Sequence, residues 1–435
     1  MFQVYCPNKT NRVIYTVEFV FNTLLQQQVE IITNKEQLTP SSITINYSSE
    51  KLEDGISIVP TGMLHSTDVI KQVTDIKYWH EIPTFFQTNE KLAIPFDLFS
   101  AVFFLITRME EYNPIKTDEH NRFVYTESAA FKHNFLQIPI VDLWCYQFIQ
   151  VINKEFNLQL TINRKYKHIS TIDIDNAYAF RAKGLVRNIL GTGKSITKFD
   201  FKSIVFRWRV LLGLEKDPYD TYALIEQMQQ QYADRSIYFF PVGDSSAYDR
   251  HLSHTNNSYQ QLIKEINSKY EIGLHPTYAN ANNLEKTKEE ADRLSDIIQQ
   301  PVDKSRYHFL RFTLPLSYQQ LTTVGITEEY SMGYAGAIGF RAGTCTPFLF
   351  YDLTQEQTTS LKVYPFQVMD ATLNNYLQLP PELAMRQISA LIEQVRKVNG
   401  TFVTLWHNES ISDRNSWENW QSVFTFMMKQ AKSNG

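Results

Sequence analysis

The chain has 435 residues, 43% of them hydrophobic, which is enough for a large buried core and by length predicts two or three domains. Its formal net charge is -4, so the composition gives no overall bias toward nucleic acid or a strongly anionic partner. The cysteines are three, widely spaced and odd in number, which argues against a disulfide framework or a cysteine-built zinc site and fits a reducing compartment.

The N-terminus lacks a basic segment followed by an apolar one, and no run of about 18 apolar residues occurs anywhere in the sequence. We therefore expect a globular, soluble protein of the cytoplasm. No nucleic-acid partner is expected, and the sequence leaves the oligomeric state open.

Residues 1–160 predict a smaller N-terminal α+β domain of unknown role. Short runs predict strands at 13–20, 30–32, 42–47 and 55–59, and a Phe- and Leu-rich helical pattern follows at 96–112. The histidines of this half are scattered, so it contains no convergent catalytic set. A polar stretch near 155–167 ends the last helical pattern, and we place the domain boundary there.

Residues 165–435 predict a second, (β/α) barrel-like domain, because strand-like and helix-like runs alternate along it. The expected strands are 168–175, 236–242, 270–275, 306–312, 338–342, 361–369 and 401–407. The expected helices include 222–232, 259–269, 283–300 and 381–398. In such barrels the polar residues at the carboxyl ends of the strands form the active site.

A basic, amphipathic segment interrupts this pattern near 181–215. Between Arg181 and Leu214 there are eight Lys or Arg residues and a single acid, Asp200, with apolar residues interleaved. Such a segment predicts a helical insertion with a solvated basic face, and a weak membrane-surface contact through 181–214 is the secondary hypothesis.

Acids and histidines follow several of the predicted strands. Asp173 and Asp175 are spaced i, i+2 at the end of the first strand, so both can point toward one spot. Further candidates close other short apolar runs downstream: His275, His308, Arg341, Asp370 and His407. This repeated placement predicts a metal site. His251 and His254 lie in a polar stretch and predict a loop rather than a ligand pair.

Taken together, these motifs resemble the polysaccharide deacetylases with NodB homology, in the subgroup that carries an extra N-terminal domain. The resemblance covers roughly 165–435 and rests on five motifs in the family's order. They are Thr171-Ile172-Asp173-Ile174-Asp175, Gly273-Leu274-His275-Pro276-Thr277, Phe340-Arg341-Ala342-Gly343, Met369-Asp370 and Leu405-Trp406-His407.

The resemblance implies one divalent metal, most readily zinc, with Asp175 and His275 as ligands. The family usually has a second histidine four residues after the first, and this chain has Ala279 there. We assign His308 as the third ligand, because a barrel brings the ends of adjacent strands together. Thr277, Glu289 or water remain alternatives for that position.

The family pattern also assigns the catalytic groups. Asp173 is the general base that takes a proton from the attacking water, and Arg341 holds this acid in its ionised form. His407 is the general acid, and Asp370 orients it and raises its pKa. A backbone N–H within 342–344 is a candidate for stabilising the oxyanion. Trp406, Tyr334, Tyr278 and Phe348 are candidates for stacking on sugar rings.

These assignments predict a metal-dependent hydrolase that removes N- or O-acetyl groups from a glycan or amino-sugar substrate. The alternative is a catalytically inactive carbohydrate-binding or scaffold protein that kept a degenerate deacetylase fold. Ala279 supports that alternative, whereas Asp173 and His407 favour the enzyme, because binding alone requires neither.

Overall fold

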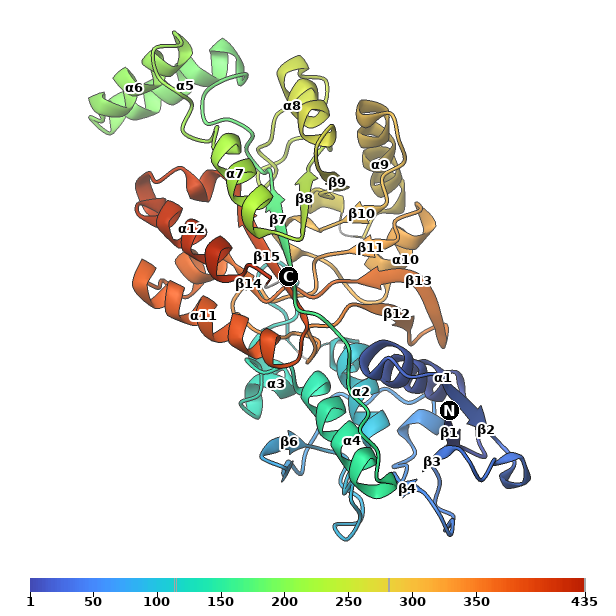
Figure 1. Ribbon diagram of the computed structural model, residues 1–435. Helices are drawn as coiled ribbons and strands as arrows, with labels where there is room; N and C mark the ends of the chain where they lie inside the picture. The colour runs from blue at the N-terminus through green and yellow to red at the C-terminus, as the bar shows by residue number, and fades with distance from the viewer. Residues whose placement is uncertain (113, 115, 281, 434–435) are drawn as a thin grey trace.

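The computed structural model describes residues 1–112, 114, 116–280 and 282–433, and its two larger sheets lie in different halves of the chain (Figure 1). The N-terminal sheet is parallel, with the order β2-β1-β3-β4. Its strands are β1 (Phe2–Tyr5), β2 (Val29–Ile32), β3 (Ile43–Asn46) and β4 (Ile56–Ser57). The same half holds helices α1 (Asn11–Glu18), α2 (Leu98–Ile106), α3 (Ala129–Lys132) and α4 (Ile140–Phe156), and the antiparallel pair β5 (Lys77–Trp79) and β6 (Ile82–Thr84).

The strand expected at 13–20 is wrong, since most of this segment belongs to α1. Thr10 caps the helix by accepting a hydrogen bond from the Val13 backbone N–H at 3.2 Å. Val13, Val17 and Val20 are fully buried and lie three or four residues apart, so they share one helical face. The β-branched composition suggested a strand, but the spacing of the buried residues is that of a helix.

The C-terminal sheet holds nine strands among the described residues, in the order β12-β13-β11-β10-β9-β8-β7-β15-β14. All neighbouring pairs are parallel except β12 and β13. The strands are β7 (Lys167–Asp173), β8 (Arg235–Phe240), β9 (Glu271–Leu274), β10 (Lys304–Ser305), β11 (Glu328–Glu329), β12 (Phe348–Asp352), β13 (Gln357–Val363), β14 (Val368–Met369) and β15 (Thr401–His407).

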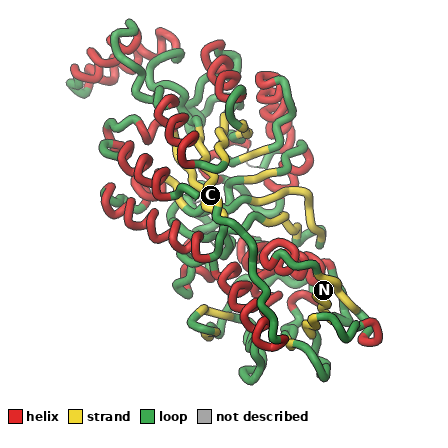
Figure 2. The backbone as a smooth tube through the Cα atoms, in the orientation of Figure 1, coloured by secondary structure: helices red, strands yellow, loops and turns green. Residues whose placement is uncertain are grey.

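This sheet curves into a barrel-like ring. Strands β13 and β14 belong to one continuous segment, which pairs with β11 at its start and with β15 at its end. Between the two, the Tyr364 N–H donates to Glu329 O and the Gln367 N–H donates to Val403 O. Figure 2 shows the strands gathered in the middle and helices around them. The expected fold class is confirmed: an α/β protein with a mostly parallel sheet.

Helices cover the outside of the ring and connect its strands. They are α7 (Tyr222–Tyr232), α8 (Asn257–Asn267), α9 (Leu284–Ile298), α10 (Leu316–Thr323), α11 (Pro381–Lys397) and α12 (Trp420–Gln430). The four helices predicted in this half correspond to α7, α8, α9 and α11, with ends that differ by no more than a few residues. Two further helices, α5 (Gly184–Thr197) and α6 (Phe201–Leu211), lie within the predicted basic insertion and project away from the sheet (Figure 1).

Two of the strands that the sequence predicts in the C-terminal half are wrong. The run 306–312 follows the two-residue strand β10 but turns at once, since Phe309 and Leu310 have positive φ angles of 59° and 52°. The run 338–342 is a buried loop. Its Phe340 N–H donates to Leu136 O of the N-terminal half rather than to a neighbouring strand. In both segments the apolar composition reflects burial and not sheet pairing.

Two hydrophobic clusters hold the barrel together. The smaller one lies inside the ring and includes Ile169 of β7, Phe239 of β8 and Leu405 of β15. The larger one lies outside the ring and continues without a break into the N-terminal half. Burial on both faces explains why these strands are nearly continuous apolar runs in the sequence.

Candidate metal centre and catalytic site

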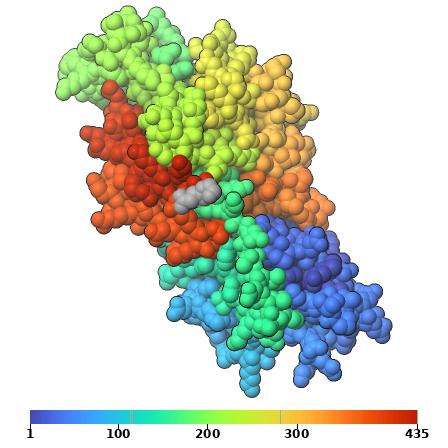
Figure 3. Space-filling view, viewed as in Figure 1, coloured from blue at the N-terminus to red at the C-terminus, as the bar shows by residue number. Residues whose placement is uncertain are grey.

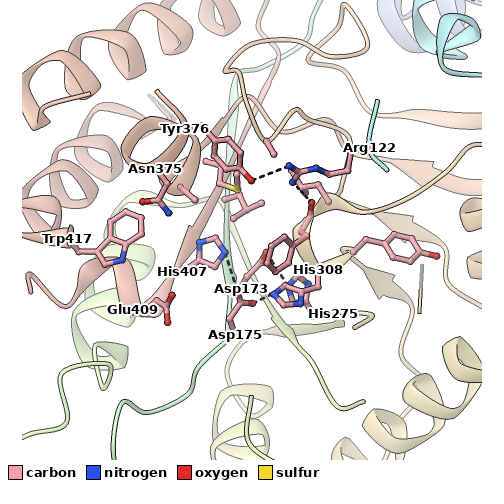
Figure 4. Close-up of a pocket in the computed structure, with 17 residues that line it drawn as sticks. Arg122, Asp173, Asp175, His275, His308, Asn375, Tyr376, His407, Glu409 and Trp417 are labelled. Carbon is pink, nitrogen blue, oxygen red and sulfur yellow. Dashed lines mark hydrogen bonds and ion pairs between the residues drawn. The ribbon is translucent and has the colours of Figure 1, made fainter. Parts of the chain in front are cut away.

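The carboxyl ends of four barrel strands bring the predicted site residues together (Figure 4). Asp173 ends β7, and Asp175 follows two residues later. His407 ends β15 and is the register partner of Asp173. His275 follows β9, and His308 lies three residues after β10. Because the strands are parallel and adjacent, residues more than 200 positions apart in the chain line one pocket.

Asp175, His275 and His308 form a cluster that could bind a metal ion, with one ligand atom from each lying within 4.8 Å of the others. Asp175 Oδ1 lies 3.2 Å from His275 Nε2, and Asp175 Oδ2 lies 3.3 Å from His308 Nε2. Among the described residues, buried Asp175 Oδ1 and His275 Nε2 have no hydrogen-bond partner. Buried polar atoms are rarely left without a partner, so the donor set fits a bound metal ion.

Hydrogen bonds behind the cluster orient both imidazoles. His275 Nδ1 lies 2.6 Å from the Arg306 backbone carbonyl, and His308 Nδ1 lies 2.8 Å from Asp249 Oδ1. A carbonyl and a carboxylate can only accept, so each Nδ1 carries a proton, and each Nε2 would present its lone pair to a bound metal. Asp249 is fully buried and also accepts the Tyr278 N–H at 2.8 Å.

The two protein alternatives to His308 lie elsewhere. Thr277 is occupied by Glu290, which accepts both its backbone N–H and its hydroxyl. Glu289 lies on α9 and pairs with Arg293. His308 reaches the cluster because the chain turns sharply after β10, and that geometry cannot be seen in the spacing of the sequence.

The N-terminal half helps to hold this turn. Arg122 donates from Nη1 to the Phe309 carbonyl at 2.8 Å and from Nη2 to the Tyr376 hydroxyl at 3.2 Å. Arg311 reaches back and donates from Nε to the His120 carbonyl at 3.1 Å. The sequence left the role of this half open, and the structure places its Arg122 in the lining of the pocket.

Arg306, and not Arg341, pairs with the proposed base. The Arg306 Nη1 donates to Asp173 Oδ1 at 3.0 Å and to the Thr171 hydroxyl at 2.6 Å, and its side chain is fully buried. The prediction for Arg341 is wrong: its guanidinium makes a bidentate ion pair with Glu111 of the N-terminal half, at 2.9 and 2.5 Å. Arg341 lies in the 338–342 loop, which faces that half rather than the pocket.

Asp370 and His407 form the expected pair. His407 Nδ1 lies 2.8 Å from Asp370 Oδ1, and Asp370 Oδ2 also accepts the His407 backbone N–H at 2.8 Å. Burial by itself would lower the pKa of His407, but the carboxylates of Asp370 and Asp175 raise it well above its usual value. The Nε2 of this imidazole lies 3.6 Å from Asp175 Oδ2.

The acids of the site have opposite pKa shifts. Burial raises the pKa of Asp175, but His308, His275 and His407 outweigh it and hold the pKa well below the usual range. Burial and the charge of Asp175 raise the pKa of Glu409, which lines the same pocket. Carboxyl groups with opposite shifts in one pocket are typical of catalytic sites.

The pocket has a volume of about 190 Å³, enough for a small group such as an acetyl but not for a whole sugar chain. Sequence reasoning missed several of its lining residues: Arg122, Asn375, Tyr376, Glu409 and Trp417. No sequence signal marked them, because they come from short helical turns beyond the strand ends and from the N-terminal half.

The other sequence candidates are mostly buried elsewhere. Trp406 packs against Trp420 and Phe424, whereas Tyr334 and Phe348 are 4% and 2% exposed and cannot stack on a sugar. The expected oxyanion donors at 342–344 lie in the loop that packs against the N-terminal half, and they do not line the pocket. His251 and His254 lie in a loop, as predicted.

Comparisons with known proteins find one family model that matches part of the chain and several solved structures of low similarity. A model described as a family of unknown function (DUF7033) matches residues 2–157. No protein with a curated description matches the sequence.

Among the similar solved structures, two are described as polysaccharide deacetylases and a third as an allantoinase. The protein from Mycobacterium smegmatis is 11% identical at a TM-score of 0.39, covering 63% of this chain and 86% of its own. Bc1974 from Bacillus cereus is 12% identical at a TM-score of 0.30, covering 62% and 87%. Puue allantoinase is 9% identical at a TM-score of 0.37, covering 62% and 84%. At this distance none of them says what this chain binds or does.

Proposed function

We propose that this protein is a metal-dependent hydrolase that removes N- or O-acetyl groups from a glycan or amino-sugar substrate, with zinc as its metal. The observation that carries the proposal is the arrangement of three groups around one small pocket: the Asp175, His275 and His308 cluster, the Asp173–Arg306 pair and the His407–Asp370 pair.

A divalent metal held by Asp175, His275 and His308 would polarise the acetyl carbonyl and activate water. Asp173 takes the proton from the attacking water as general base, and Arg306 holds its carboxylate in place through a hydrogen bond. His407 gives its Nε2 proton to the departing amine or alkoxide, while Asp370 holds its Nδ1–H. Base and acid are register neighbours on β7 and β15.

The test measures metal content and acetate release on the same preparations. We expect about one tightly bound metal per chain after dialysis against zinc, loss of this metal in His308→Ala, and release of acetate from acetylated amino sugars. His254→Ala is the matched control, because this histidine lies in a loop and outside the cluster. Asp173→Asn should keep the metal and lose the activity. Wild-type protein without metal, or an active Asp173→Asn variant, would contradict the proposal.

The inactive carbohydrate-binding alternative rests on Ala279. The position of His308 beside Asp175 and His275 supports the enzyme instead, since His308 would supply the third ligand. Acetate release by the wild type distinguishes the two functions. A binding protein would release no acetate from any acetylated amino sugar.

A further inference from the structure

The basic insertion folds into a helical hairpin, residues 184–212, that projects from the carboxyl-end side of the barrel (Figures 1 and 3). Helices α5 and α6 pack mainly against each other. The neck of the hairpin is held in place by Asp217, whose carboxylate accepts three successive backbone N–H groups at 179–181, between 2.8 and 3.0 Å. Asn256 also donates to the Ala182 carbonyl at 3.0 Å. The projection is therefore a fixed part of the fold.

The hairpin and its flanks expose an unusual amount of apolar surface. In the described part of the chain, ten of the 21 exposed large hydrophobic side chains lie between residues 185 and 214. They are Leu185, Val186, Ile189, Leu190, Ile196, Phe199, Phe201, Val205, Leu212 and Leu214. Single exposed apolar residues need no explanation, but a concentrated group on one projecting element indicates a binding surface.

The spacing of these residues places them on faces rather than at random. On α5, Leu185, Ile189 and Ile196 lie on one helical line, with Val186 and Leu190 beside it, within an arc of about 140°. On α6, Phe201 and Val205 begin a second line that Leu212 continues.

Phe199 stands at the turn between the two helices. It is 81% exposed, and its backbone has a φ of 55°, a conformation that a bulky residue rarely adopts. A large aromatic ring at such a tip contributes nothing to packing within the chain. It would gain burial only in an external apolar phase.

The charge of the hairpin indicates what kind of partner this surface binds. The segment 181–214 carries eight Lys or Arg and one acid, and only Arg181 and Arg209 form ion pairs with a carboxylate among the described residues. The surface continues into a cleft of about 780 Å³ between the hairpin and the barrel. The charged residues that line it are mostly basic, namely Lys183, Arg187, Arg207, Arg250 and Arg414, with two acids, Asp413 and Glu418. A symmetric contact with a second copy would bring these like charges together, and nucleic acid offers no apolar phase.

We propose that the hairpin docks onto the surface of a membrane that contains anionic lipids. Its apolar residues would enter the boundary between headgroups and acyl chains, while the lysines and arginines contact the lipid phosphates. No helix in the described residues is long and apolar enough to cross a membrane, so the contact is interfacial. Docking would keep the catalytic pocket beside a membrane, since Asn176 lines the cleft and bonds to Glu409, which lines the pocket.

Vesicle co-sedimentation of the full-length protein tests this inference, and it does not depend on the metal or on activity. We expect binding to vesicles of phosphatidylcholine mixed with phosphatidylglycerol, and much weaker binding to phosphatidylcholine alone. The variant Leu190→Ser/Phe199→Ser/Val205→Ser should bind at least about tenfold more weakly. Leu284→Ser/Leu383→Ser, which changes exposed leucines on α9 and α11, is the matched control and should bind like the wild type.

A second variant isolates the charge, since Lys194→Gln/Lys198→Gln/Lys202→Gln should reduce binding and its dependence on salt. All of the changed side chains are exposed, so the melting temperature should be unchanged in every variant. Failure of the wild type to bind, or full binding by the Leu190/Phe199/Val205 variant, would overturn the proposal. A dimer in sedimentation velocity that this variant abolishes would instead show that a second copy covers the surface. Acetate release from soluble sugars should be the same in all of these variants.

Discussion

Replacing Arg306 by Met should remove the partner of the proposed base while leaving the metal cluster intact. The methionine keeps most of the aliphatic volume between Phe239 and Phe366, whose ring centres lie 4.7 and 5.7 Å from the guanidinium carbon. The substitution leaves the buried Asp173 carboxylate without its ion pair, which costs about 3–5 kcal/mol of folding stability. Because Arg306 holds His275 through its backbone carbonyl, metal affinity should stay within a few-fold of the wild type.

The assay compares melting temperature, zinc affinity by chelator competition, and kcat for acetate release. We expect kcat to fall by about 10²–10⁴, the usual contribution of a positioned base. Arg341→Met is the matched control, because Arg341 is also buried, pairs with the buried Glu111 and lies against two aromatic rings. It should lose less stability than Arg306→Met, because Arg108 still pairs with Glu111 at 2.8 Å, and it should keep kcat. If Arg306→Met keeps kcat, or if Arg341→Met loses it with the metal retained, the assignment of the base partner is wrong.

Three further predictions concern groups around the site and the barrel. Asp249→Asn weakens the acceptor behind His308 and should reduce zinc affinity by about 10–100-fold in competition titrations; unchanged affinity would exclude His308 as a ligand. Asp370→Asn should lower kcat by about 10²–10⁴ and leave the zinc affinity unchanged. Because the pKa of His407 falls without the carboxylate, activity should be lost first on the alkaline side of the pH profile. Burial lowers the pKa of His168 to about 4, so the unfolded chain takes up a proton on this residue between about pH 6.5 and 4 and the folded chain does not. As the pH falls through that range, the wild type should therefore lose about 3 kcal/mol more unfolding free energy than His168→Gln. Urea denaturation at several pH values measures this difference. An equal pH dependence in the two proteins would refute the prediction.

Local patterns in the sequence predicted many of the helices and strands of the barrel. The segments 222–232 and 381–398 have long amphipathic patterns of helical period, so the sequence alone predicts these helices. The i, i+2 spacing of Asp173 and Asp175 follows from the pleat of a strand, which is a property of the local backbone alone. For the same reason the sequence could place His275 and His407 after apolar runs that proved to be strands.

Apolar composition was a poor guide where the chain is buried without being a strand. The runs 306–312 and 338–342 have the apolar character of barrel strands, yet one forms a sharp turn and the other a loop against the N-terminal half. Period and length cannot separate these cases, because burial on all sides removes the alternation of polar and apolar residues that marks a strand.

The sequence by itself determined which residue types stand at the strand ends, and with them the chemistry that the pocket can support. Only the tertiary structure decided which arginine pairs with Asp173, and it brought Arg122 of the N-terminal half to the turn that carries His308. The physical reason is that a side chain's ion-pair partner depends on which strands are neighbours and on where a loop turns. Those are contacts between residues more than a hundred positions apart, and no local period records them.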